Sequence, residues 1–262
     1  MPETIHIATD RRGVARLTLS RPEKHNALSA AAIDELTTAA HQLGRDPAVR
    51  AVILAGDGQS FCAGGDLGWM RAQVDAGRGA RMAEARRLAM MFKALYELPK
   101  PVIARVHGNA FGGGVGLISV SDLAVAASTA RFGLTEVRLG LIPATISPYV
   151  VARIGEGRAR PLFMSGKVFD VWQAQAVGLV ARTVPAEELD ETIEGEIRHF
   201  LAAAPGAVAR AKALARSLGP PITDATIENV VSQLAASWET EEAKEGLTAF
   251  FERREPRWPR GD

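Results

Sequence analysis

Residues 107–116 read HGNAFGGGVG, a glycine-rich turn that directly follows the short apolar run 102–106. A second turn of the same kind, SFCAGGDL at residues 60–67, follows the apolar run 51–55. Short apolar runs bounded by turn residues are typical of strands that are buried on both faces. Glycine in such a turn lets backbone N–H groups approach a ligand closely. For one turn alone, however, tight packing without a ligand is the preferred interpretation.

Short apolar runs and helical stretches alternate along the first two thirds of the chain. A third apolar run occupies residues 123–127, and helical stretches, notably residues 82–98, separate the three runs. Alternation of this kind predicts an α/β layered fold with crossover connections. Residues 5–7 and 14–19 alternate in polarity around a turn at residues 10–13, which predicts a hairpin.

Helix signals flank this alternating region. Ser29 is suited to cap a helix whose apolar face consists of Ile33, Leu36, Ala40 and Leu43. From about Glu187 onward the pattern is helical throughout. Helices are predicted at residues 189–201, 207–218, 222–238 and 239–251. The segments APG at 204–206 and GPP at 219–221 separate the first three of these helices.

Bulk composition restricts the class of protein. The chain has 262 residues, with 31 Lys and Arg against 30 Asp and Glu, and a formal net charge of +1. No global field therefore favours nucleic acid or a membrane as a partner, and no uncharged apolar run reaches the roughly 18 residues of a membrane span. Cys62, the single cysteine, cannot form an internal disulfide. Residues 1–4 lack the features of a signal peptide, so we expect a cytoplasmic protein.

The glycine-rich turns do not match the common nucleotide-binding motifs. Neither turn fits the dinucleotide fingerprint Gly-x-Gly-x-x-Gly, and no phosphate loop with Gly-Lys-Ser/Thr occurs. The five histidines show no metal-ligand spacing. Two backbone N–H groups that converge on one point would instead form an oxyanion hole.

Together with the motifs around them, the two turns resemble the crotonase (enoyl-CoA hydratase/isomerase) family over nearly the whole chain. The matching segments are RPEKHNAL at 21–28, FCAGGDL at 61–67, NAFGGGVG at 109–116 with Asp122, ARFGLTEVRLGLIP at 130–143, GLV at 178–180 and FFERR at 250–254. Each segment is a weak signal alone, whereas their order and spacing are highly specific.

The resemblance implies an α/β crotonase-type spiral of β-β-α turns with a helical C-terminal region that assembles trimers, often paired as hexamers. It divides the chain into a spiral core with the CoA thioester site at residues 1–200 and an oligomerisation region at residues 201–262. It also implies that the backbone N–H groups of Gly65 and Gly113 hold the thioester carbonyl. Such donors stabilise the negative charge of a thioester enolate.

The resemblance implies one catalytic carboxylate here rather than two. Family hydratases place two glutamates at the reacting double bond, at the positions of Gly116 and Glu136 in this chain. Glu136 lies between apolar neighbours, where loss of water would raise its pKa toward the range of a general acid/base. With Gly116, a lone glutamate could hydrate, could isomerise by moving a proton between the α- and γ-carbons, or could serve a site that binds acyl-CoA without turnover.

One further stretch favours hydration among these alternatives. Residues 136–150, EVRLGLIPATISPYV, resemble the bacterial branch of methylglutaconyl-CoA hydratase-like enzymes, in which Gly-Gly-Gly-Val-Gly also occurs. We therefore expect an enoyl-CoA hydratase, with a Δ3,Δ2-enoyl-CoA isomerase as the alternative enzyme. The alternative of another class is a non-catalytic protein that binds acyl-CoA or RNA.

The resemblance also implies a set of binding residues. The expected contacts of substrate and CoA are Lys24, Ala63, Gly65, Asp66, Leu67, Gly112, Gly113, Phe250 and Arg254. For Asp66 the preferred role is structural, as the cap of the helix that begins near Leu67. Five arginines in residues 71–87 form a solvated helix face or lid, or else meet CoA phosphates or a distal acyl carboxylate. No metal or redox cofactor is implied, because CoA is part of the substrate.

Overall fold

The computed structural model describes residues 4–258, and its N-terminal strands form the expected hairpin. Strands β1 (Ile5–Thr9) and β2 (Val14–Leu19) pair antiparallel, with Ile5 opposite Leu19. The hairpin begins a six-stranded sheet of order β1-β2-β3-β5-β7-β10. The remaining strands of this sheet are β3 (Ala51–Gly56), β5 (Val102–Val106), β7 (Leu123–Ala127) and β10 (Arg182–Val184). From β2 onward the neighbouring strands are parallel, as crossover connections require.

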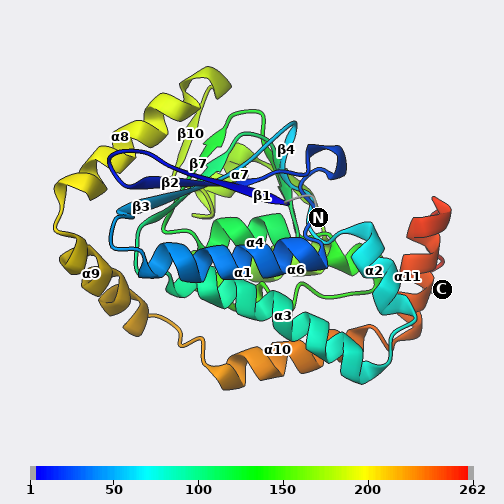
Figure 1. Ribbon diagram of the computed structural model, residues 1–262. Helices are drawn as coiled ribbons and strands as arrows, with labels where there is room; N and C mark the ends of the chain where they lie inside the picture. Colours follow the sequence, from blue (N-terminus) through cyan, green and yellow to red (C-terminus); the bar gives the residue numbers. More distant parts are fainter. Residues whose placement is uncertain (1–3, 259–262) are drawn as a thin grey trace.

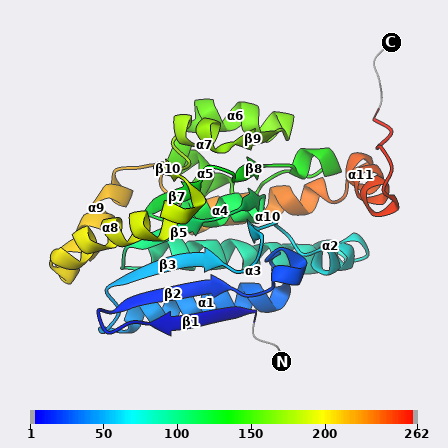
Figure 2. The same ribbon diagram turned by 90° about the horizontal axis from the view of Figure 1, so that it is seen from above.

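A second, smaller sheet has the order β4-β6-β8-β9. Its strands are β4 (Ser60–Cys62), β6 (Asn109–Phe111), β8 (Arg131–Gly133) and β9 (Val168–Asp170). Strands β3, β5 and β7 of the large sheet each lead into β4, β6 and β8 of the small one, and helical structure follows each pair. The chain therefore forms the predicted spiral of β-β-α turns (Figure 1, Figure 2).

Helices lie between and after the two-strand units (Figure 1). They are α1 (Ala30–Arg45), α2 (Leu67–Val74), α3 (Arg78–Glu97), α4 (Gly113–Val120), α5 (Ser147–Ile154), α6 (Glu156–Ser165), α7 (Val171–Ala176) and α8 (Leu189–Ala202). Three single turns of 3₁₀ helix are η1 (Pro22–Lys24), η2 (Glu136–Leu139) and η3 (Ala186–Glu188). Ser29 caps α1 as predicted, because its side chain accepts a hydrogen bond from the backbone N–H of Ala32.

Burial on both faces explains the continuous apolar runs of β3, β5 and β7. On one face Ile53, Ile103 and Val125 pack against α8. The other face joins the main core, which includes the predicted apolar side of α1. A strand covered on both faces has no need of alternating polarity, which is why these three runs could be recognised in the sequence.

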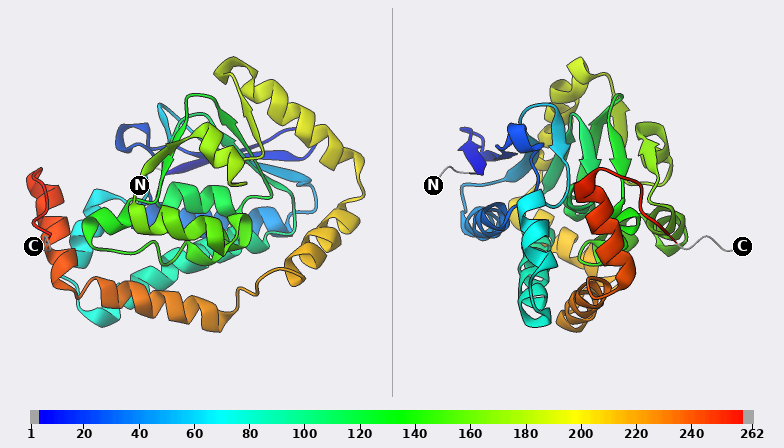
Figure 3. Two further views of the ribbon diagram at one scale, coloured as in Figure 1. Left: turned by 180° about the vertical axis from the view of Figure 1, so that it is seen from behind. Right: turned by 90° about the vertical axis from the view of Figure 1, so that its right-hand side faces the viewer.

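The C-terminal helices run along the outside of the molecule (Figure 3). They are α9 (Pro205–Ser217), α10 (Asp224–Ser237) and α11 (Glu241–Glu252). No residue of α9 is buried, whereas Val231 of α10 and Leu247 of α11 belong to the main core. A Cβ atom on Gly246 would lie 2.6 Å from the carbonyl oxygen of Leu139, so the absent side chain lets α11 lie directly on η2. Within residues 4–258, no helix is long and apolar enough to cross a membrane.

Candidate active site

The two glycine-rich turns meet at the carboxyl ends of the small sheet. Strands β4, β6 and β8 are parallel, so the segments that follow them emerge at the same edge. These segments are Ala63–Asp66, Gly112–Gly113 and Leu134–Glu136. The carboxyl ends of parallel strands are the usual position of a binding site in α/β folds.

The first turn directs the N–H group of Gly65 away from the neighbouring backbone. The N–H of Leu28 donates to the carbonyl oxygen of Gly64 (2.7 Å), and the N–H of Asp66 donates to the carbonyl oxygen of Leu28 (3.1 Å). This pairing is a parallel bridge between Leu28 and Gly65. Because successive N–H groups of an extended chain point to opposite sides, the N–H of Gly65 faces away from Leu28.

The second turn presents the N–H group of Gly113 in the first turn of α4. Gly112 has a φ of +47°, which favours glycine, and its own N–H donates to the carbonyl oxygen of Gly133 (2.9 Å). The first N–H groups of a helix have no acceptor within the helix. A Cβ atom on Gly113 would lie 3.7 Å from the Cα atom of Gly64, so the two turns are in contact.

Two backbone donors therefore remain available at this contact. Within residues 4–258, no protein acceptor takes up the N–H of Gly65 or the N–H of Gly113. Both residues line the same cavity. An oxygen atom held by both donors would be stabilised as negative charge develops on it.

Glu136 is the carboxylic acid of the site. It begins η2 directly after β8, and its Oε1 atom lies 2.9 Å from the position of a Cβ atom on Gly112. Its Oε2 atom is buried and has no hydrogen-bond partner among the described residues. Burial raises the pKa of Glu136 to about 7, although a hydrogen bond from its own backbone N–H lowers the pKa in part. Glu136 can therefore both accept and return a proton near neutral pH.

The position of the second family glutamate has no room for a side chain. A Cβ atom on Gly116 would lie 2.4 Å from the Cγ2 atom of Ile146 and 2.9 Å from the Cε1 atom of Phe92. Both neighbours are buried. The glycine is therefore part of a packed apolar contact between α3, α4 and the segment before α5, and the site has a single carboxylate.

The cavity at these turns has a volume of about 530 Å³ and is lined mainly by apolar groups. Its lining residues are Leu28, Ile33, Ala63, Gly64, Gly65, Leu67, Trp69, Met70, Leu88, Phe111, Gly112, Gly113, Thr135, Glu136, Arg138, Leu139, Leu141, Ile142, Pro143, Ala144, Thr145, Ile146, Val168, Leu234, Trp238 and Phe250. Among these residues only Glu136 and Arg138 carry a charge. Such a cavity suits an acyl chain that reacts at one end.

Most of the predicted binding residues lie at this cavity. Those that line it are Ala63, Gly65, Leu67, Gly112, Gly113 and Phe250. Lys24 is exposed on η1 and lies outside the lining. Asp66 caps α2 through the N–H groups of Gly68 and Trp69 and pairs with Arg21 at 3.1 Å. Arg254 also lies outside the lining.

Two acidic side chains hold Arg254 in place. Its guanidinium group pairs with Glu245 at 2.6 Å and with Glu252 at 2.7 Å. The aromatic ring of Phe250, from the same helix, reaches the cavity of its own chain. Phe250 therefore lines the cavity, whereas the guanidinium group of Arg254 lies outside the lining and is paired with Glu245 and Glu252.

The arginines of residues 71–87 are all engaged by other parts of the chain, and none of them lines the cavity. Their partners are the Phe251 ring for Arg71, Glu239 for Arg78, the carbonyl oxygens of Gln73 and Val74 for Arg81, Glu228 for Arg86, and Asp34 and Glu84 for Arg87. Arg138 is the cation that lines the cavity, and it forms no ion pair within residues 4–258.

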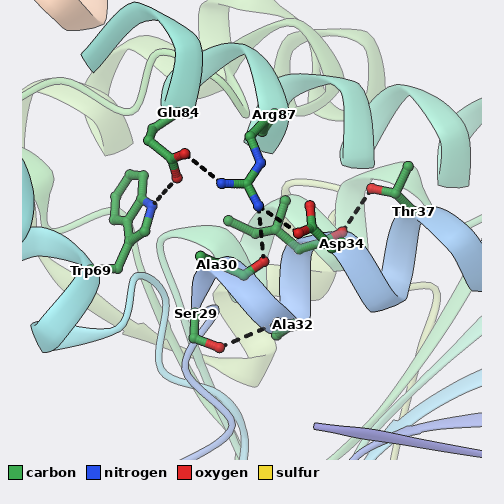
Figure 4. A network of polar contacts seen from close by, with 9 residues as sticks. Ser29, Ala30, Ala32, Asp34, Thr37, Trp69, Glu84 and Arg87 are labelled. Atoms are coloured by element: carbon green, nitrogen blue, oxygen red, sulfur yellow. Dashed lines mark hydrogen bonds and ion pairs between the residues drawn. The ribbon is translucent and has the colours of Figure 1, made fainter. Parts of the chain in front are cut away.

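Trp69 lines the cavity but was not predicted from the sequence as a residue of the site. Its Nε1 atom donates to Oε2 of Glu84 (2.9 Å), and Glu84 also pairs with Arg87 (Figure 4). Arg87 in turn pairs with Asp34 of α1 at 2.6 Å. The network joins α1, α2 and α3 and fixes the indole ring. No local pattern around Trp69 indicates this role, because its partners lie 15 residues or more away in sequence.

Comparison with known proteins agrees with this geometry. Residues 9–261 match the family model described as enoyl-CoA hydratase/isomerase. The chain belongs to the enoyl-CoA hydratase/isomerase family, as its resemblance to crotonases predicted.

Three similar proteins illustrate the relationship. A crotonyl-CoA hydratase of Syntrophomonas wolfei is 32% identical, with 92% of each chain covered. The crystal structure of an enoyl-CoA hydratase of Mycobacterium smegmatis has a TM-score of 0.79 at 36% identity and covers 97% of this chain and 98% of that one. The crystal structure of an enoyl-CoA hydratase of Mycobacterium avium has a TM-score of 0.85 at 32% identity, with coverages of 99% and 100%.

Proposed function

We propose that the chain is an enoyl-CoA hydratase that adds water to a 2-enoyl-CoA thioester with Glu136 as its acid–base group. The observation that carries this proposal is the buried Oε2 atom of Glu136, which has no hydrogen-bond partner among residues 4–258, in one cavity with the backbone N–H groups of Gly65 and Gly113, which have no acceptor among those residues. All three residues line one apolar cavity. The names of the relatives support the same reaction.

The mechanism uses one carboxylate twice. The N–H groups of Gly65 and Gly113 hold the thioester oxygen, which draws electron density from C3 of the double bond. The Glu136 carboxylate takes a proton from water as the water oxygen bonds to C3, and the displaced electron pair moves through C2 to the thioester oxygen. The enolate then collapses as protonated Glu136 returns the proton to C2. Atoms and charge balance without a redox step, so the proposal includes no metal or redox cofactor.

We propose an acyl group that is branched or that carries a second carboxylate. Arg138 supports the second feature, because it is the cationic residue of a largely apolar lining and has no acidic partner among the described residues. Guanidinium groups bind carboxylates through paired hydrogen bonds. The methylglutaconyl type of substrate combines a branch with a distal carboxylate.

The CoA part of the substrate would lie outside the lined cavity. Lys24 remains a proposed contact for the pantetheine and adenine parts of CoA, because it is exposed on η1, four residues before the cavity residue Leu28. Phe250 is a proposed contact on the α11 side. Arg254 would have to exchange Glu245 and Glu252 for a phosphate.

A Δ3,Δ2-enoyl-CoA isomerase is the second candidate function, because the packing around Gly116 leaves the site with one carboxylate. Isomerisation needs only one base, and Ile146 and Phe92 leave no space for a second carboxylate at Gly116. The site residues would be the same in both reactions.

Product mass distinguishes the two reactions. Purified protein is offered crotonyl-CoA, 3-methylglutaconyl-CoA and a 3-enoyl-CoA, and products are identified by mass spectrometry. A product heavier by one water that disappears in Glu136→Gln supports the hydratase. Conversion of the 3-enoyl thioester without change of mass, with no hydration of any substrate, would replace it with the isomerase.

We also propose that residues 201–262 carry subunit contacts in a homotrimer or hexamer, next to a catalytic core at residues 1–200 whose cavity they help to line through Leu234, Trp238 and Phe250. Two features of α9 support this assignment. None of its residues is buried, and it exposes 62% of Leu214. Leu218, directly after the helix, is 81% exposed. Large apolar side chains that gather on one surface commonly mark a protein interface.

A further inference from the structure

With a single carboxylate in the site, only one of the two hydrogen atoms of the attacking water has an identified acceptor. Glu136 accepts one hydrogen of the water, and the water oxygen turns its lone pair to C3. The other hydrogen needs an acceptor within the apolar cavity, because an unpaired polar group costs free energy there. In a site with two glutamates the second carboxylate would accept it. Gly116 has no space to supply one.

Few neutral side chains of the cavity lining offer a polar atom. Those that do are Trp69, Thr135 and Thr145. The indole N–H of Trp69 is a donor only and is already bound to Glu84. The hydroxyl groups of both threonines form no hydrogen bond with residues 4–258.

Burial distinguishes the two threonines. Thr145 is 5% exposed, so its hydroxyl depends on the content of the cavity for a partner. Thr135 is partly exposed, and bulk water can solvate it. Thr145 also precedes Ile146, the residue whose Cγ2 atom fills the space beside Gly116. The free hydroxyl therefore belongs to the segment that occupies the place of a second glutamate.

We infer that Thr145 is the water-positioning residue of this site, with its Oγ1 atom accepting the hydrogen of the nucleophilic water that Glu136 does not take. The inference rests on the proposed function. In the reaction, the O–H bond that faces Glu136 breaks and the C3–O bond forms, while the O–H bond that faces Thr145 stays intact. The hydroxyl of Thr145 neither gains nor loses a proton, so no further reactant is needed.

Thr145→Val tests the inference, because it keeps the shape of the side chain and removes its oxygen. We expect kcat for hydration to fall about tenfold, the effect of one hydrogen bond, with KM unchanged. Exchange of the α-hydrogens of butyryl-CoA in D2O needs Glu136 and the oxyanion hole but no bound nucleophile. It should stay within about twofold of wild type. Thr145→Ser should restore hydration, and Thr9→Val, a control on the exposed side of β1 outside the cavity lining, should leave both activities unchanged.

Three outcomes would overturn the inference. Hydration unchanged in Thr145→Val would contradict it while the proposed function stands. An equal loss of hydration and α-hydrogen exchange, with no rescue by Thr145→Ser, would mean that Thr145 supports the fold of the site instead. Absence of hydration by the wild-type protein on every 2-enoyl thioester would contradict the proposed function first, and the inference with it.

Discussion

The Oε1 atom of Glu136 lies 2.9 Å from the position that a Cβ atom on Gly112 would occupy. The carboxyl group therefore rests against the backbone of the turn that presents the N–H of Gly113. Gly112 also has a φ of +47° and a ψ of −112°, a conformation that side chains disfavour. Gly112 therefore has two roles: it allows the backbone conformation of the turn, and it leaves room for the carboxyl group of Glu136.

We expect Gly112→Ala to impair activity more than stability. The added methyl group pushes the carboxyl away, and a displacement of about 1 Å in a catalytic group can lower the rate about 10²-fold. Backbone strain and crowding should lower the free energy of unfolding by about 1–3 kcal/mol. Hydration kinetics and urea denaturation measure the two effects.

Gly157→Ala in α6 is the matched control. A Cβ atom there meets no heavy atom within 4 Å, and alanine suits a helix better than glycine. This variant should keep its activity and lose no stability. Full activity in Gly112→Ala would contradict the position of Glu136.

The raised pKa of Glu136 predicts a stability that falls as the pH rises. The native carboxyl has a pKa of about 7, against an ordinary value of 4.5. Between these values the native state holds a proton that the unfolded chain has released, so the free energy of unfolding declines by about 3 kcal/mol at most and is constant above pH 7. Glu136→Gln removes this decline.

Denaturant titrations of wild type and Glu136→Gln at pH 5, 6, 7 and 8 measure the difference between the two proteins. The variant should gain stability relative to wild type as the pH rises to 7. A constant difference over this range would show that the native pKa is ordinary.

The contact of Gly116 with Ile146 predicts coupled substitutions. Gly116→Ala should cost about 1–3 kcal/mol of unfolding free energy, because its Cβ would lie 2.4 Å from the Cγ2 atom of Ile146. The cost should be smaller in an Ile146→Ala background, which removes that atom. A double-mutant cycle by urea denaturation measures the coupling, and additive costs would contradict the packed contact.

The sequence predicted the features of this protein that depend on local patterns. Local patterns predicted the apolar runs of β3, β5 and β7 and the helices α8 to α11. Glu136 was predicted as the acid/base from a contiguous motif with apolar flanks, and it lines the cavity. Asp66 was correctly expected to cap α2.

Features that depend on packing between distant segments were not predictable. The sequence shows that Gly116 stands where family hydratases have a glutamate. Only the structure shows that Phe92 and Ile146 occupy the space that a side chain at this position would need. The sequence showed the arginines of residues 71–87 but not the groups with which they pair. Those partners lie as far away in the sequence as Glu239. Trp69 and Thr145 became cavity residues only once the chain was folded.

Arg138 predicts a preference among acyl groups. Arg138→Met removes the charge and keeps much of the length, so KM for 3-methylglutaconyl-CoA should rise about 10-fold or more through loss of a charged hydrogen-bonded pair. KM for crotonyl-CoA, which has no distal carboxylate, should change less than twofold. Arg11→Met, in the exposed β1–β2 turn, is the control. Equal effects of the substitution on KM for both substrates would show that Arg138 does not recognise the acyl group.

The pH dependence of kcat/KM for hydration tests the role of Glu136 most directly. The carboxylate form is the one that accepts a proton from water, so kcat/KM should rise tenfold per pH unit up to about pH 7 and level off above it. Glu136→Gln should lower kcat/KM by at least about 10² at every pH and abolish the inflection. A wild-type profile that is flat between pH 5.5 and 8.5, or an inflection that persists in Glu136→Gln, would contradict the account.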